Sequence, residues 1–153
     1  MNVAFIWFGC TLAIGALLFA RRYLPGRFGV ISVVLWCVSG VGSVGVGLFP
    51  VNQDPTIHAL VALPIFAAQP LALLLMGLAL RDDRPRTARA THVVAALSAV
   101  GSIGFGLPVG GDSSAIGAVE RLALWPGYLW VCLVAAGSVS RGHTQHGSRR
   151  EVQ

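Results

Sequence analysis

The side chains with the clearest chemical potential lie where apolar segments begin. Asp54 and His58 belong to the polar stretch GLFPVNQDPTIH (Gly47–His58), and Glu120 and Arg121 precede another apolar run. A carboxyl group and an imidazole can exchange protons with a substrate, and an arginine can bind an anionic group. Ionisable groups near membrane depth are costly, so each of these four is a candidate functional residue. The candidates for catalysis are therefore His58, Asp54 and Glu120.

Each candidate in the Gly47–His58 stretch also has a structural interpretation. Asp54 before Pro55 is typical of a helix start, because an aspartate N-cap accepts backbone N–H groups and proline suits the first helical position. His58 and Gln69 are eleven residues apart, about 16 Å along one stripe of a helix. They could form hydrogen bonds between helices. Alternatively, Gln69 could bind a ligand and His58 could handle a proton or a ligand.

Arg121 requires a partner at a helix start. The positive end of the helix dipole favours an acid such as Glu120 in the first turn and disfavours an unpaired arginine. Asp54, Asp112 or Glu120 could supply the partner.

Arg121, Trp125, Tyr128 and Cys132 recur at helical spacing and predict a stripe that runs from polar to aromatic into the membrane. Trp and Tyr often anchor a helix at the interface. The alternative is that Arg121, Trp125 and Tyr128 bind a lipid headgroup or an isoprenoid.

Composition identifies an integral membrane protein. Apolar residues make up 55% of the 153 residues, charged residues 11%, and the mean hydropathy is +0.73. A soluble domain needs roughly twice this charge density. The net charge of +5 does not indicate nucleic-acid binding, because the arginines flank apolar segments and do not alternate with aromatics along a groove.

Apolar segments near twenty residues long predict an all-α bundle of five transmembrane helices in a single domain, residues 1–140. The predicted helices are 2–20, 28–49, 58–80, 93–109 and 121–139. The polar segment 141–153 is expected to be a disordered cytoplasmic tail. The fourth span repeats the small-residue spacing of the second, with Ser98, Ser102 and Gly106 corresponding to Ser32, Ser39, Ser43 and Gly47, so these two spans are predicted to pack together.

The arginines predict the orientation. Ten of the eleven lie in the first connector, the third connector or the C-terminal tail, and only Arg121 lies on the other side. Positive charge accumulates on the cytoplasmic side, so the N-terminus is expected outside and the C-terminus inside the cytoplasmic membrane. Arg21 and Arg22 follow the first apolar run, whereas a cleaved signal peptide carries its positive charge before the apolar run. This run is therefore predicted to be a spanning helix and not a signal peptide.

The GLFP…D…H connector and the ERL sequence at Glu120–Leu122 resemble an uncharacterised membrane family, domain of unknown function family 998. The resemblance covers residues 29–139. It implies a small helical bundle in which Pro50, Asp54, His58, Glu120 and Arg121 form a shared constellation, and it supplies no reaction. Family members typically carry one more N-terminal spanning helix than this chain.

The sequence leaves three functions open. The first is a non-enzymatic membrane component that binds a lipid or partner protein through a polar cluster at the non-cytoplasmic face; it could also form a homo-oligomer. The second is an enzyme acting on a lipid or isoprenoid, for example a terpene cyclase in which a carboxylic acid donates a proton and Trp125 and Tyr128 shield a cation. The third, a transporter, is the least supported, because no inverted repeat is visible. No nucleotide-binding loop, zinc signature or nucleophile elbow occurs, and no cofactor or metal is predicted.

Overall fold

The computed structural model describes residues 2–106 and 113–150. These residues form helices joined by short connectors. The helices are α1 (Asn2–Tyr23), α2 (Gly26–Leu48), α3 (Pro55–Leu80), α4 (Pro85–Gly106) and α5 (Ser113–Arg150). Helices α2, α3, α4 and the Ile116–Gly137 part of α5 are long and apolar enough to cross a membrane, and α1 contributes a shorter apolar stretch, Asn2–Leu18. The predicted all-helical membrane architecture is therefore present.

The surface and the interior have the polarity expected in a lipid environment. Large apolar side chains such as Leu18, Leu60 and Leu63 are at least 65% exposed. Small polar side chains are buried instead, among them Ser32 and Ser39. A bilayer can cover exposed apolar side chains, and a buried hydroxyl group can bond across helices, as Ser32 Oγ does by donating to the Ala72 carbonyl at 2.8 Å.

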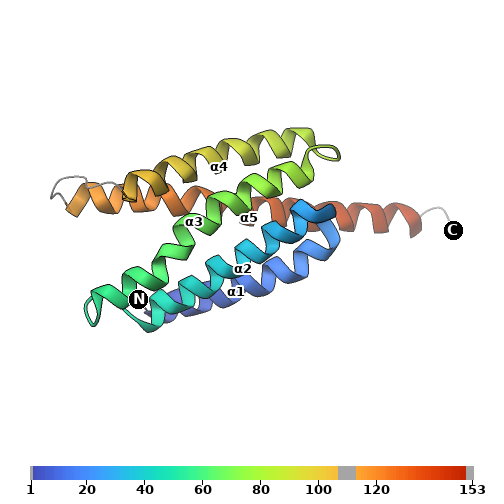
Figure 1. Ribbon diagram of the computed structural model, residues 1–153. Coiled ribbons are helices and arrows are strands. Elements are labelled where there is room, and N and C mark those ends of the chain that lie inside the picture. Colours follow the sequence, from blue (N-terminus) through green and yellow to red (C-terminus); the bar gives the residue numbers. More distant parts are fainter. Residues whose placement is uncertain (1, 107–112, 151–153) are drawn as a thin grey trace.

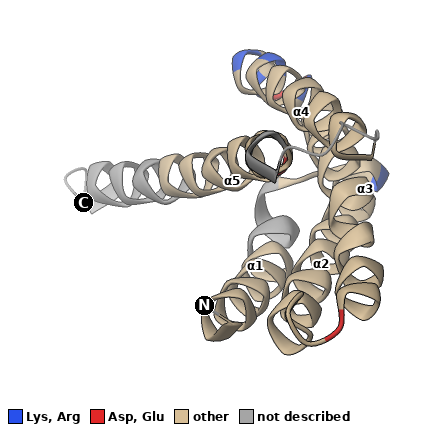
Figure 2. Cartoon of the chain, turned by 90° about the vertical axis from the view of Figure 1, so that its left-hand side faces the viewer, with Lys and Arg blue, Asp and Glu red and all other residues tan. Residues whose placement is uncertain are grey.

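Most helices pack on their neighbours in sequence. Helix α2 lies between α1 and α3, and α4 lies between α3 and α5. Figure 1 shows the N-terminus and the α2–α3 connector at one end of the bundle, and the short α1–α2 and α3–α4 connectors at the other. In Figure 2, α5 stands apart from α1 and α2.

The predicted pairing of the second and fourth spans was wrong. The small residues of α2 are buried as expected, but they face α1 and α3. A Cβ atom at Gly40 would lie 2.7 Å from the Gly9 carbonyl oxygen of α1, and one at Gly42 would lie 2.7 Å from the Ile65 side chain of α3. Similar spacing in two helices indicates that each packs closely, but not against which partner.

Helices α4 and α5 extend furthest beyond the predicted spans. Helix α4 begins at Pro85, eight residues before the predicted residue 93, because proline suits the first helical turn and the buried Ala88 packs against α3. Helix α5 begins at Ser113, inside a predicted connector, and continues to Arg150, into the segment expected to be a disordered tail. The apolar segment marks the part of a helix that can lie in lipid, not the full hydrogen-bonded helix.

Candidate functional site

Asp54 acts as the N-cap of α3. Its carboxylate accepts the backbone N–H groups of Thr56 at 3.0 Å and Ile57 at 2.9 Å, and Pro55 occupies the first turn. The structural interpretation of Asp54 is thus confirmed. Its side chain does not line the cavity described below.

His58 lies one turn into α3 and is fixed by the end of α2. Its Nδ1 lies 2.8 Å from the carbonyl oxygen of Phe49. A carbonyl oxygen only accepts, so Nδ1 carries the proton in this bond. In a neutral imidazole, Nε2 is then left as an acceptor.

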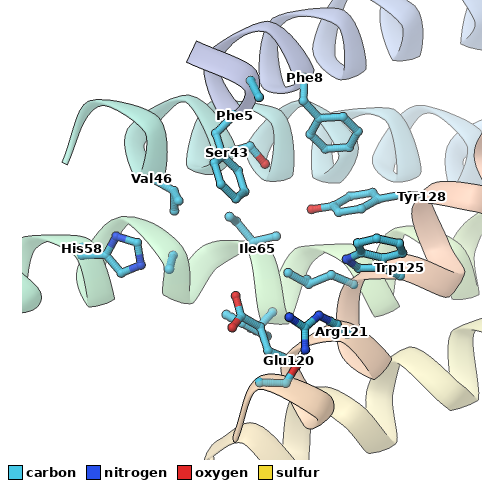
Figure 3. Close-up of a pocket in the computed structure, with 15 residues that line it drawn as sticks. Phe5, Phe8, Ser43, Val46, His58, Ile65, Glu120, Arg121, Trp125 and Tyr128 are labelled. Atoms are coloured by element: carbon cyan, nitrogen blue, oxygen red, sulfur yellow. Dashed lines mark hydrogen bonds between the residues drawn. The ribbon is translucent and has the colours of Figure 1, made fainter. Parts of the chain in front are cut away.

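A cavity of about 490 Å³ lies between α5 and helices α1, α2 and α3 (Figure 3). We call it the first cavity. Its walls are mainly apolar, and the polar side chains of His58, Glu120 and Arg121 reach it from α3 and α5. The other lining residues are Ala4, Phe5, Phe8, Ser43, Val46, Ala62, Ile65, Phe66, Gly117, Leu124, Trp125 and Tyr128. A volume of this size suits a drug-sized ligand or part of a lipid.

The structure brings together most of the predicted site. Five of the seven predicted residues line the first cavity: His58, Glu120, Arg121, Trp125 and Tyr128. The last three belong to the predicted stripe on α5, whose 3–4 spacing places them on one face. The remaining two, Asp54 and Gln69, do not line it.

Arg121 forms no ion pair within the described part of the chain. Its Nη1 donates a long bond of 3.4 Å to the Gly117 carbonyl, one turn earlier in α5. The predicted partners Asp54 and Glu120 do not pair with it, and the third, Asp112, lies outside the described residues. The Arg121 guanidinium therefore directs none of its N–H donors to the carboxylates of Asp54 and Glu120.

Gln69 joins three helices and does not reach the cavity. It is fully buried, and its Nε2 donates to the carbonyls of Ala123 at 3.2 Å and Leu124 at 2.8 Å in α5. Ser98 of α4 donates to the same Ala123 carbonyl. These carbonyls precede Pro126, which lacks an N–H group and disturbs the hydrogen bonds of the preceding turn. Gln69 thus forms hydrogen bonds between helices, as its structural interpretation predicts, and these bonds hold α5 in place.

The α1 and α2 walls were not predicted. Phe5 and Phe8 contribute aromatic rings from α1, and the Phe8 ring meets Tyr128 edge-on with centroids 4.5 Å apart. The Tyr128 hydroxyl lies near Ser43 of α2. No sequence signal marks Phe5 and Phe8, because α1 is apolar on all faces.

Within the residues that the structure describes, no three histidine, cysteine, aspartate or glutamate side chains converge to hold a metal ion. The site consists instead of an apolar chamber with one cation, one carboxylate and one imidazole at its wall. Such a chamber can accept an amphiphilic molecule.

Fold and site together define a small multi-pass helical membrane protein with a cavity between its first and last helices. The chain belongs to the family described as protein of unknown function (DUF998), which matches residues 1–137. The match confirms the resemblance read from the connector and the ERL sequence. It extends beyond the expected 29–139 at the N-terminal side and includes α1. No curated protein and no solved structure matches the chain.

Proposed function

We propose that this protein binds a phospholipid in the first cavity, with the lipid phosphate at Arg121. The observation that carries the proposal is that Arg121, unpaired with any described carboxylate, lines a mainly apolar chamber in a membrane protein. A phosphate group would accept several guanidinium N–H groups in short, charge-assisted bonds. The apolar walls would contact the hydrocarbon part of the same molecule.

The rim of the cavity favours a ligand that arrives from the bilayer. Phe5 of α1 is 41% exposed and Trp125 of α5 is 61% exposed. Both rings line the cavity, and they come from α1 and α5, two helices that lack extensive contact with each other. A lipid could enter sideways between the two helices without crossing a polar surface.

The proposed site faces the outer side of the cytoplasmic membrane. The first cavity is at the bundle end that contains the Pro50–Asp54 connector. The α1–α2 and α3–α4 connectors, with the arginines in and around them, are at the opposite end. Cytoplasmic connectors carry the excess of arginine, so the cavity end would be non-cytoplasmic.

Native mass spectrometry of the full chain, released from membranes in mild detergent, tests this proposal. With phosphatidylglycerol as the probe, Arg121→Gln should weaken binding about 10- to 100-fold, because a hydrogen bond to a charged group contributes about 1.5–3 kcal/mol. The matched control is Arg81→Gln, whose side chain is 70% exposed at the other end of the bundle. Equal phosphatidylglycerol binding by the Arg121 variant and the control would refute the proposal.

A second candidate is an enzyme acting on an isoprenoid. It is favoured by the presence of Glu120 in the same cavity as the aromatic rings of Trp125, Tyr128 and Phe8, since a carboxylic acid could start a cyclisation and the rings could shield a carbocation. The enzyme hypothesis predicts that the protein converts an added polyprenyl or epoxidised substrate and that Glu120→Gln abolishes this turnover. Lipid binding is the better supported function, because the other predicted acid, Asp54, is engaged as a helix cap.

A further inference from the structure

A second cavity of about 630 Å³ continues the first along the same two helices. On α5, the first cavity is lined from Gly117 to Tyr128 and the second from Val131 to Ala135. On α1, the first is lined up to Phe8 and the second from Phe8 to Leu18. The two chambers are therefore consecutive, and Phe8 is part of both.

A pair of aromatic rings forms the partition. Phe8 of α1 and Tyr128 of α5 meet edge-on, with ring centroids 4.5 Å apart. Tyr128 lines only the first cavity, and Val131, one turn further along α5, lines only the second. Both partition residues are side chains on helices that lack extensive contact with each other, so the passage is controlled by rotamers and not by backbone packing.

The walls of the second cavity are mainly hydrocarbon and offer a ligand few hydrogen-bonding groups. Its walls include Leu12, Ala16, Val33 and Met76. The hydroxyl of Thr11 is already used, because it donates to carbonyls of its own helix at 2.9 Å. Trp36 and Cys132 also line this cavity, but the Trp36 Nε1 atom is buried away from its surface and a thiol is only a weak donor. A polar ligand would therefore replace few of its hydrogen bonds to water here, whereas an alkyl chain has none to lose.

The path is long enough to hold an acyl chain. From Glu120 to Ala135, α5 rises about 22 Å, at 1.5 Å per residue. One leaflet of the hydrocarbon core is about 15 Å thick, half of the total. Leu18 at the rim of the second cavity is 75% exposed, so this chamber also borders the bilayer.

We propose that a single phospholipid occupies both cavities, with its phosphate at Arg121 and one acyl chain passing Phe8 and Tyr128 into the second cavity. This inference rests on the proposed lipid binding in the first cavity. Its consequence is selectivity for chain length, because only a long acyl chain reaches past the aromatic pair.

Filling the second cavity tests the inference. Gly15 lines this cavity, and a Cβ atom at this position would meet nothing within 4 Å, so Gly15→Leu adds a side chain to open space. The matched control is Gly137→Leu on α5, which also has no neighbour within 4 Å and lines neither cavity. Ala135→Leu fills the second cavity independently, from the α5 wall.

The full chain in detergent is titrated with phosphatidylglycerol carrying either two hexanoyl or two palmitoyl chains, and binding is followed by native mass spectrometry. We expect Gly15→Leu and Ala135→Leu to weaken binding of the palmitoyl lipid at least tenfold and to leave the hexanoyl lipid within twofold. Gly137→Leu should change neither.

The outcomes separate the two proposals. Unchanged palmitoyl binding in both cavity-filling variants, with Arg121→Gln still weakening both lipids, would overturn the two-cavity path and leave the phosphate site standing. Equal weakening of both lipids by the cavity-filling variants would also overturn it. If Arg121→Gln affects neither lipid, the proposed function itself fails.

Discussion

Gly101 of α4 is a position at which a single added methyl group should be strongly destabilising. A Cβ atom there would lie 2.6 Å from Cα of Ala123 in α5, and both nearest atoms belong to backbone, which cannot rotate away. Ordinary carbon contacts need about 3.5–4.0 Å, so Gly101→Ala must separate α4 from α5 by about 1 Å.

The cost can be estimated from the contacts at this crossing. Overpacking typically costs about 1–3 kcal/mol. The separation would also weaken the hydrogen bond from Ser98 to the Ala123 carbonyl, and such interhelical bonds average about 0.6 kcal/mol. We therefore expect Gly101→Ala to lower the free energy of unfolding by about 2–3 kcal/mol.

The assay is equilibrium unfolding in mixed micelles, with helix content followed by circular dichroism. Gly106→Ala is the matched control, because it lies on the same helix and its added Cβ would meet nothing within 4 Å. The control should be neutral or stabilising by up to about 1 kcal/mol, because alanine is the better helix former. If the two alanine variants unfold together, the close approach of α4 and α5 is refuted.

Two further predictions concern the Pro50–Asp54 connector. Asp54→Ala should lower the free energy of unfolding by about 1 kcal/mol through loss of the α3 cap. It should not change phosphatidylglycerol affinity, because Asp54 does not line the first cavity. An Asp83→Ala control should leave stability unchanged, and a loss of lipid affinity in the Asp54 variant would contradict its purely structural role. In a chain whose native cysteines are replaced by serine, Asn52→Cys should react with a membrane-impermeant maleimide on intact cells and Asp83→Cys only after permeabilisation. The reverse labelling pattern would overturn the orientation.

Local chemistry explains which parts of the site could be predicted. Asp54 and Pro55 specify a helix start through neighbouring residues alone, and the cap is present. Arg121, Trp125 and Tyr128 share a face because of helical geometry, whatever surrounds them. The structure brings all three to one cavity.

Features that depend on two helices were harder to predict. The polar character of Gln69 indicated a buried hydrogen bond, but its acceptors, the carbonyls before Pro126, are 54 and 55 residues away in sequence. The small residues of α2 likewise indicated close packing without identifying α1 and α3 as partners. In lipid, an apolar helix has no polar face that could reveal its orientation, so Phe8 gave no signal.

The position of α1 has a consequence for how the site forms. One wall of each cavity comes from α1 and another from α5, the first and last helices of the chain. Helices α1 to α4 can pack in sequence order as each neighbour becomes available, but neither cavity is enclosed until α5 is held against α3 and α4. Gln69, Ser98 and Gly101 provide that attachment, since all three meet α5 near Ala123. Substitutions at these three positions should therefore alter lipid binding indirectly, by moving α5, although none of them lines a cavity.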